Sequence, residues 1–276
     1  MLELISGGLL IGGSLFWWAT RAHRKRKQYE AERLSEADWE VIRQEVPIIQ
    51  VLPKKFHREF ERNVCVLIQE KNFESAGGLE EVTREMKLMI MAQAALLLTG
   101  RPHRYFPRLR SVILYPDAYR DSKSDEDGVD GVKGSVRLGE SWGHGSIVLS
   151  YRSVEMGGKD PKDGQNVVLH EFAHQLDQET GWGDGVPVLA ERGDYRTWAK
   201  AFSMAYEELQ EDVETGRRTV LDDYGATNPA EFFAVATETF FEKGEQLREA
   251  KPAIYEQLKL YYGMDPAEWA RVETAR

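Results

Sequence analysis

The sequence predicts an α+β fold that is mostly helical, contains a small sheet, and is preceded by one N-terminal transmembrane helix. Residues 4–20 contain no charged side chain, as expected of a membrane-spanning segment. Two short runs rich in strand-forming residues, 111–115 and 146–151, are typical of strands. Helical patterns recur along the chain, in residues 35–44, 54–70, 79–98, 194–210 and 253–262. We therefore expect helices to supply most of the core, with the sheet beside them.

The uncharged segment and its flanks predict a membrane anchor of defined orientation. Its 17 residues are close to the minimum for a spanning helix, and Trp17 and Trp18 stand where interfacial aromatic side chains are common. Five Lys or Arg side chains follow within residues 21–27, whereas a secretory signal carries its positive charges before the apolar run. The positive-inside rule then places the rest of the chain in the cytoplasm. An interfacial or signal-like segment is the alternative interpretation.

Charge and cysteine content narrow the class of protein. The chain of 276 residues has a net charge of −10, with +4 in residues 1–27 and −14 in the remainder. An acidic body argues against direct nucleic-acid binding, and the basic cluster is better suited to anionic lipid. The single cysteine, Cys65, excludes an internal disulfide and suits a reducing compartment. Its two valine neighbours predict a buried thiol.

The length allows an anchor and one globular unit of two lobes. We expect the anchor with its basic flank in residues 1–27, a helical lobe in residues 28–110, and the lobe that carries the chemistry in residues 111–276. Ser35 and Asp38 have the spacing of a capping box, which predicts the start of a helix. If residues 146–151 form an edge strand, their backbone can pair with an extended peptide; an ordinary core strand is the alternative.

The run His170-Glu171-Phe172-Ala173-His174 is the strongest chemical signal in the chain. Residues four apart lie on the same face of a helix, so the two imidazoles form a ready pair of Zn²⁺ ligands. Glu171 is placed to take a proton from a water that the metal activates. We expect this helix to begin with Asp163 as its N-cap and to end at Gly181. The alternative is a pair of core histidines bonded to carboxylates.

A catalytic zinc needs a third protein ligand, which must come from elsewhere in the chain. The extended motif with a third histidine is excluded, because that position is Thr180. A glutamate on a later helix is the remaining common solution, and Asn228 and Pro229 predict the start of such a helix. Glu231 and Glu238 lie on nearly the same face of it. Glu231 can instead close a capping box onto Asn228, so spacing favours it only slightly.

Several runs resemble the Mlc titration factor A family of zinc metallopeptidases, whose active site is related to that of anthrax lethal factor. Residues 169–177 resemble the zinc helix of that family, and residues 223–235 resemble its second signature. Residues 139–150 and 185–187 are similar to the segments around the zinc helix. The resemblance covers roughly residues 35–265. It implies a zincin-like metallopeptidase domain, preceded here by the N-terminal anchor.

The resemblance also implies roles for individual residues. Glu231 would be the third ligand of one Zn²⁺ ion, beside His170 and His174. Tyr224 would line the site, where its hydroxyl can donate a hydrogen bond to the oxyanion that forms during hydrolysis. Its alternative is an exposed aromatic residue at the edge of a loop. Asp177 either orients a ligand histidine or is an ordinary capping or solvated carboxylate.

The predicted function is that of a zinc-dependent, aminopeptidase-like peptidase with Glu171 as general base, acting on a peptide or protein substrate. A purely structural zinc would usually have four protein ligands, often including Cys, and no Cys lies near these motifs. The alternative is a regulatory protein that sequesters a transcriptional repressor, as the resemblance implies for Mlc, with weak or secondary peptidase activity. With the anchor, the expected location is the bacterial inner membrane, single-pass, with the catalytic domain in the cytoplasm. The alternative is a soluble cytoplasmic protein.

Overall fold

The computed structural model describes residue 21 and residues 24–117, 139–142 and 145–269. The predicted anchor, residues 4–20, lies outside these residues, as do residues 118–138. Within the part of the chain that is described, none of the helices combines the length and the apolar character needed to cross a membrane. A transmembrane helix is therefore not found, whereas the predicted predominance of helices with a small sheet is confirmed.

Helices form most of the described chain. They are α2 (Glu36–Glu45), α3 (Lys54–Glu70), α4 (Arg84–Leu96), α5 (Tyr151–Lys159), α6 (Val167–Asp177), α7 (Asp194–Thr215), α8 (Pro229–Glu242), α9 (Gly244–Ala250) and α10 (Pro252–Tyr262). Short 3₁₀ turns are η1 (Pro47–Val51), η2 (Gln178–Thr180), η3 (Asp223–Ala226) and η4 (Pro266–Glu268). Residues 24–31 are also helical. The predicted helices agree with α2, α3, α7 and α10, while α4 begins five residues later than expected because Thr83 caps it.

The sheet has four strands in the order β1-β2-β4-β3. Strands β1 (Asn72–Ser75), β2 (Ser111–Tyr115) and β4 (Ser146–Ser150) run parallel, and β3 (Gly139–Trp142) pairs with β4 in the antiparallel direction. Strand β4 therefore lies between two partners, so of the two alternatives for this segment the core strand is confirmed and the edge strand is not. Its apolar side chains instead face the core: Ile147 and Leu149 are buried.

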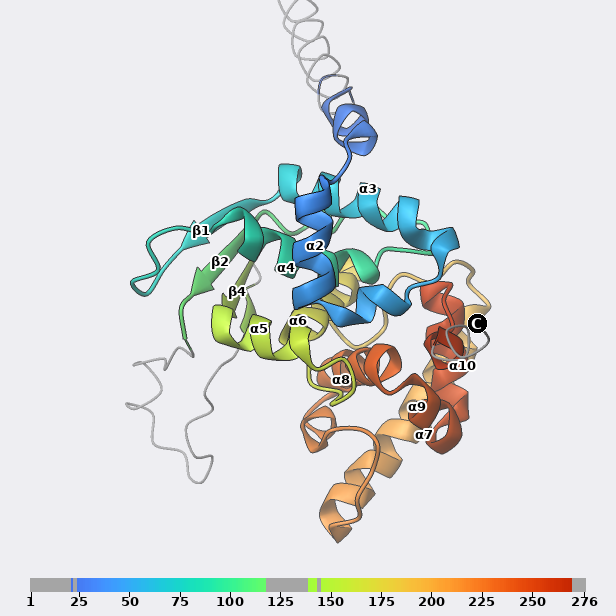
Figure 1. Ribbon diagram of the computed structural model, residues 1–276. Helices are drawn as coiled ribbons and strands as arrows, with labels where there is room; N and C mark the ends of the chain where they lie inside the picture. The colour runs from blue at the N-terminus through green and yellow to red at the C-terminus, as the bar shows by residue number, and fades with distance from the viewer. Residues whose placement is uncertain (1–20, 22–23, 118–138, 143–144, 270–276) are drawn as a thin grey trace, which may run out of the picture.

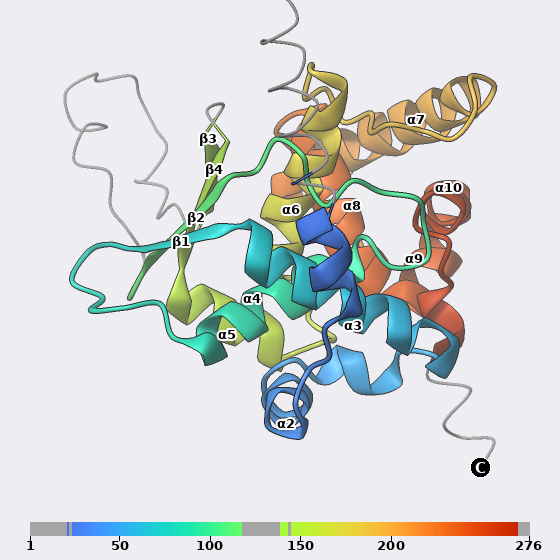
Figure 2. The ribbon, with the colours of Figure 1, turned by 90° about the horizontal axis from the view of Figure 1, so that it is seen from above.

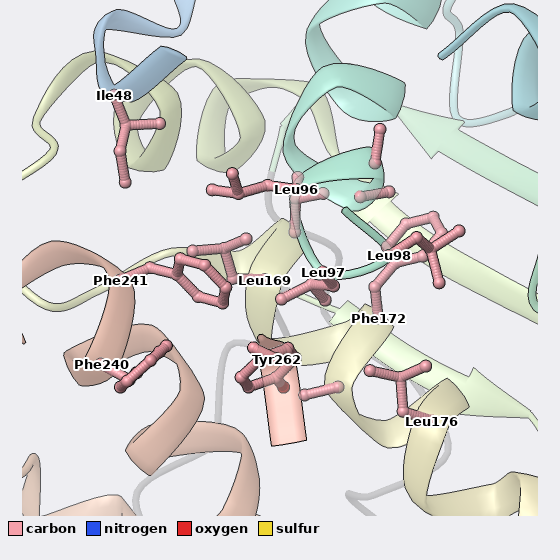
Figure 3. Close-up of a cluster of buried hydrophobic side chains, with 14 of the residues drawn as sticks. Ile48, Leu96, Leu97, Leu98, Leu169, Phe172, Leu176, Phe240, Phe241 and Tyr262 are labelled. Atoms are coloured by element: carbon pink, nitrogen blue, oxygen red, sulfur yellow. The ribbon is translucent and has the colours of Figure 1, made fainter. Parts of the chain in front are cut away.

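Helix α6 lies at the centre of the molecule, with the sheet on one side and α8, α9 and α10 on the other (Figures 1 and 2). Its apolar face packs against the end of α4 and against the C-terminal helices (Figure 3). The side chains in this contact include Leu96, Leu97, Leu98, Leu169, Phe172, Leu176, Phe240, Phe241 and Tyr262. Each fully buried side chain of this size contributes about 1.5–3 kcal/mol, so α6 is held rigidly. Cys65 lies in the same core cluster, as its valine neighbours predict, and burial raises the pKa of its thiol to about 11.

The residues that follow the predicted anchor are attached to the body of the protein. Arg26 donates two hydrogen bonds, of 2.6 and 2.8 Å, to the carboxylate of Glu70 on α3. The hydroxyl of Tyr105 donates to Glu30, and the Arg26 guanidinium lies over the Tyr105 ring. Arg26 belongs to the basic cluster that was expected to face lipid, so one member of this cluster binds the protein itself.

Helix α2 begins with the predicted capping box, and its acidic member also joins two helices. Ser35 accepts a hydrogen bond from the backbone N–H of Asp38, and Asp38 accepts one from the backbone N–H of Ser35. Arg84 at the start of α4 donates two further hydrogen bonds, of 2.6 and 2.8 Å, to the same carboxylate. The hydrogen bond from Arg84, aided by those from Ser35, lowers the pKa of Asp38 from 3.8 to about 2.

We expect Asp38→Ala to lower the free energy of unfolding by about 1–2 kcal/mol at pH 7, because it removes a helix cap and a partly exposed ion pair. The pKa of Asp38 is lower in the folded state, so its stabilisation is present above about pH 4 and is lost as the pH falls through about 2. Urea unfolding of both proteins at pH 7 and near pH 2.5 measures this. Glu40→Ala, at an exposed position of the same helix, is the control. If the difference in free energy of unfolding between wild type and Asp38→Ala is no smaller near pH 2.5 than at pH 7, the stabilisation does not come from the charged form of Asp38.

Candidate metal centre

The helix that carries His170 and His174 begins at Asn166, not at Asp163. The Asn166 side-chain oxygen accepts hydrogen bonds from the backbone N–H groups of Val168 and Leu169. Asp163 lies one turn earlier, where its carboxylate accepts a hydrogen bond only from the backbone of Gln165. The predicted end of this helix, Gly181, agrees better with the structure. Helix α6 continues as the 3₁₀ turn η2, which ends at Gly181 in the left-handed conformation, with φ +99°.

Helix α8 begins as predicted, with Asn228 as its N-cap and Pro229 as its first residue. The Asn228 side-chain oxygen accepts from the backbone N–H groups of Ala230 and Glu231. The Glu231 carboxylate is directed at two histidines of α6: its Oε2 lies 2.9 Å from Nε2 of His170 and 3.2 Å from Nε2 of His174. The structure thus brings together residues that are 57 and 61 positions apart in the chain.

The geometry of these three side chains suits one metal ion. The two Nε2 atoms lie 3.2 Å apart, so the three closest atoms form a triangle with sides of 2.9–3.2 Å. Ligand atoms bound to one tetrahedral zinc at about 2.0–2.1 Å are about 3.3 Å apart. His170, His174 and Glu231 form a three-residue cluster able to hold an ion, within the described part of the chain. Imidazole nitrogen with carboxylate oxygen is a donor set that zinc prefers.

Glu238, the alternative to Glu231 as third ligand, lies on the other side of the His170 ring. Its Oε1 accepts a hydrogen bond from Nδ1 of His170, at 2.8 Å, on the side of the ring away from Glu231. Its Oε2 accepts from the backbone N–H of Asn166. A carboxylate at Nδ1 fixes the tautomer and orientation of the ring, which leaves the Nε2 lone pair available for a metal.

A third carboxylate of α8, Glu242, extends the contact between the two helices. Its Oε1 accepts from the Asn166 amide at 2.9 Å, and its Oε2 accepts from the backbone N–H of Gly164 at 3.0 Å. The Asn166 amide also donates to the carbonyl of Gly157. Sequence reasoning missed Asn166 and Glu242, although Glu231, Glu238 and Glu242 have the spacing of one helix face. That spacing could have indicated that Glu242 faces the same side of α8 as Glu231 and Glu238.

The carboxylates make this site attractive to positive charge. Burial lowers the pKa of His170, but hydrogen bonds with Glu231 and Glu238 outweigh it and raise this pKa to about 10. Burial favours the neutral form of Glu231, yet its hydrogen bonds with His170 and His174 lower its pKa to about 2. Burial dominates at Glu242, where it raises the pKa to about 9.

Glu171 occupies a different environment from the other carboxylates. Its side chain is buried, and burial raises its pKa. Its Oε2 has no hydrogen-bond partner among the described residues. Buried carboxylate oxygens are normally paired, so this atom has an unused capacity to accept a proton or a hydrogen bond.

Tyr224 lies beside the histidines but is not buried. It belongs to η3, just before α8, and its ring centroid is 5.9 Å from that of His170. Tyr224 is 55% exposed, whereas the side chains of His170 and His174 are largely buried. The structure therefore brings Tyr224 to the neighbourhood that the resemblance implied.

Asp177 organises the loop that follows the helix rather than a histidine. It is buried, and its Oδ2 accepts a hydrogen bond from the backbone N–H of Gly185 at 2.9 Å. Trp198 on α7 donates its indole N–H to the carbonyl of Gly185. A Cβ atom on Gly185 would lie 2.3 Å from the carbonyl oxygen of Pro229, and its φ is +81°. Only glycine fits there, so the loop is fixed to α6, α7 and the start of α8.

Comparison with known proteins supports the interpretation of this cluster. Residues 20–263 match the family described as glucose-regulated metallo-peptidase M90. The chain belongs to this family. Membership points to a metallopeptidase-type domain and to a bound metal ion, in agreement with the grouping of His170, His174 and Glu231.

Relatives of known sequence extend over most of this chain. An uncharacterised protein of Synechocystis is 37% identical over 229 residues, which cover 82% of this chain and 83% of the relative. Mlc titration factor A of Serratia proteamaculans is 31% identical, over 90% of this chain and 93% of its own length. Its counterpart in Yersinia pestis is 30% identical, over 80% of this chain and 82% of its own length. The resemblance to the Mlc titration factor A family is thus confirmed.

We expect Glu238→Gln to weaken metal binding by about tenfold. Both oxygens of Glu238 accept from N–H groups, so the amide of glutamine would face one of these donors with its own N–H group. Competition with a chelator measures the affinity, and the absorption spectrum of the cobalt-substituted protein reports the ligand geometry. Glu249→Gln, on the exposed surface of α9, is the charge-matched control. An affinity within twofold of wild type would show that Glu238 does not position His170.

Proposed function

We propose that this protein is a zinc-dependent peptidase of the HExxH type, with His170, His174 and Glu231 as metal ligands. The observation that carries the proposal is the convergence of the two Nε2 atoms and Glu231 Oε2 within 3.2 Å of one another, beside the unpartnered Oε2 of Glu171. Membership of a metallopeptidase family supports it. Zinc is proposed because its usual ligands match the donor set.

A bound zinc ion supplies Lewis-acid chemistry, which lowers the pKa of water and polarises a carbonyl. Glu171 is the proposed general base: its Oε2 takes the proton of the attacking water and then passes it to the leaving amine. Burial of Glu171 favours this role because it brings the pKa of the carboxyl closer to that of its proton donor. Tyr224, which lies beside His170, donates a hydrogen bond to the developing oxyanion.

The proposed substrates are small peptides that are cleaved from the amino terminus. This aminopeptidase-like preference rests on the resemblance stated above. A peptide panel with free and acetylated amino termini tests it, because an aminopeptidase leaves the acetylated members intact.

We expect Glu171→Gln to retain the metal and to lose at least about 100-fold in kcat, since glutamine cannot accept a proton at neutral pH. Metal content is measured by atomic emission and hydrolysis with the same peptide panel. Tyr224→Phe, which lacks only the hydroxyl, is expected to lower kcat with little change in KM. A Glu171→Gln protein that binds zinc and still cleaves at the wild-type rate would sink this mechanism.

A second proposed function follows from the names of two relatives. The Serratia and Yersinia proteins are named for titration of Mlc, and a related role here would be the binding of a transcriptional repressor. Metal binding by the wild-type protein without hydrolysis of any peptide in the panel would favour this role. A pull-down with purified Mlc then tests it directly, with Glu171→Gln as a variant that should bind equally well.

We also propose that residues 4–20 anchor the protein in the inner membrane, with the metal centre in the cytoplasm. The absence of charge in this segment and the basic residues that follow it support the proposal. We expect the full chain to sediment with membranes and a chain that begins at residue 24 to remain in the supernatant. A cysteine introduced near residue 2 should react with an impermeant reagent from the periplasmic side. Labelling of that residue only after lysis would refute the proposed topology.

A further inference from the structure

A cavity of about 890 Å³ lies beyond the end of the zinc helix. Its walls come from the loop after α4, the turn η2, the loop before α7 and the end of α10. The lining residues that matter here are Arg101, His103, Glu179, Trp198, Leu260 and Tyr261. None of the three proposed metal ligands lines it, nor do Glu171 and Tyr224. It is therefore distinct from the metal centre, although Glu179 follows His174 by only five residues.

Three of the residues around this cavity have a buried polar atom without a hydrogen-bond partner among the described residues. They are Nη1 of Arg101, Nδ1 of His103 and Oη of Tyr261. Such atoms are uncommon in folded proteins because each costs free energy, so three around one cavity call for an explanation. A ligand that accepts hydrogen bonds from the arginine and the tyrosine would satisfy two of them.

The neighbouring residues Tyr261 and Tyr262 differ in the hydrogen bonding of their hydroxyl groups. The Tyr262 hydroxyl is 2.9 Å from the hydroxyl of Thr237 and is thereby paired. The Tyr261 hydroxyl has no hydrogen-bond partner among the described residues, and burial raises its pKa well above 10, so it remains a hydrogen-bond donor. The Arg101 guanidinium lies 4.1 Å above the Tyr261 ring. Because both donor atoms are buried, their side chains must move before a ligand can contact them.

The remaining walls carry a second arginine, Arg104, three carboxylates, Glu179, Glu191 and Asp194, and an apolar surface. Glu179 supplies a carboxyl group whose pKa is raised by burial, although the positive charges of Arg101 and Arg104 oppose this shift. Leu260 is 75% exposed and Val188 is 44% exposed, so both offer apolar surface to a ligand in the cavity. Trp198 contributes a buried aromatic wall. A cation, an anion and an apolar wall together match a small zwitterion with an apolar side chain.

We propose that this cavity binds the zwitterion of an apolar amino acid or of a short peptide. Its carboxylate accepts hydrogen bonds from Arg101 and Tyr261, its ammonium group faces Glu179, and its side chain covers Leu260. Free amino acid and peptide share this chemistry. The proposal does not rest on the peptidase mechanism.

Titration calorimetry with the Glu171→Gln protein tests the site without hydrolysis of the ligand. The probes are leucine, leucyl-leucine, leucinamide, N-acetylleucine and inorganic phosphate. We expect saturable binding of leucine or leucyl-leucine at about millimolar concentration or below, and the tighter of the two identifies the source. Leucinamide lacks the carboxylate and N-acetylleucine lacks the ammonium group, so each should bind at least about fivefold more weakly.

Variants locate the binding site. Tyr261→Phe should weaken the preferred ligand at least about fivefold, and Arg101→Gln at least about tenfold. Tyr262→Phe is the matched control: it removes a paired hydroxyl, so it should lower stability and leave binding unchanged. Leu260→Ser, at an exposed position, should weaken binding of leucine more than binding of glycine, a further probe that lacks the side chain.

Any of three results would overturn the proposal: no saturable binding of either zwitterion, binding of leucinamide or N-acetylleucine as tight as that of the preferred zwitterion, or binding that Arg101→Gln and Tyr261→Phe leave unchanged. Binding of phosphate alone would also overturn it, since that would mark a simple anion site. Because Glu171→Gln is used throughout, these failures are independent of whether the protein is a peptidase.

Discussion

The contact between the carboxylates of α8 and the start of α6 is the constraint on which the metal centre depends. Glu238 and Glu242 accept hydrogen bonds from the backbone and side chain of Asn166, which itself caps α6. Buried carboxylates are costly unless they are paired. A shift of either helix would break these hydrogen bonds and leave the carboxylates buried without partners, which would destabilise the fold. The same contact sets the separation of Glu231 from His170.

The apolar packing on the other side of α6 complements this polar contact. Leu169, Phe172 and Leu176 fix the helix against α4 and the C-terminal helices (Figure 3). Two of the proposed metal ligands thus project from one helix and the third from another, which is a more accurate way to place ligands than a loop provides. The loop after α6 is also held, through Asp177 and the close approach of Gly185 to Pro229.

Local sequence rules predicted a large part of this arrangement. Asn228 and Pro229 start α8, and Ser35 and Asp38 start α2, because capping depends on residues only two or three positions away. The start of α6 shows the limit of such rules. Asp163 and Asn166 are both good caps locally, and Asn166 caps the helix while its amide pairs with Glu242, 76 residues away. The short elements β1 and α9 were missed because their partners, not their own patterns, stabilise them.

The sequence by itself determined that His170 and His174 share one helix face, since the period of the helix decides which neighbours align. It also placed Glu231 and Glu238 on one face of α8. Only the tertiary structure decided that Glu231 meets the Nε2 atoms and that Glu238 meets Nδ1 of His170. The physical reason is that spacing along a chain fixes the geometry within one helix, whereas the packing of apolar faces fixes how two helices meet.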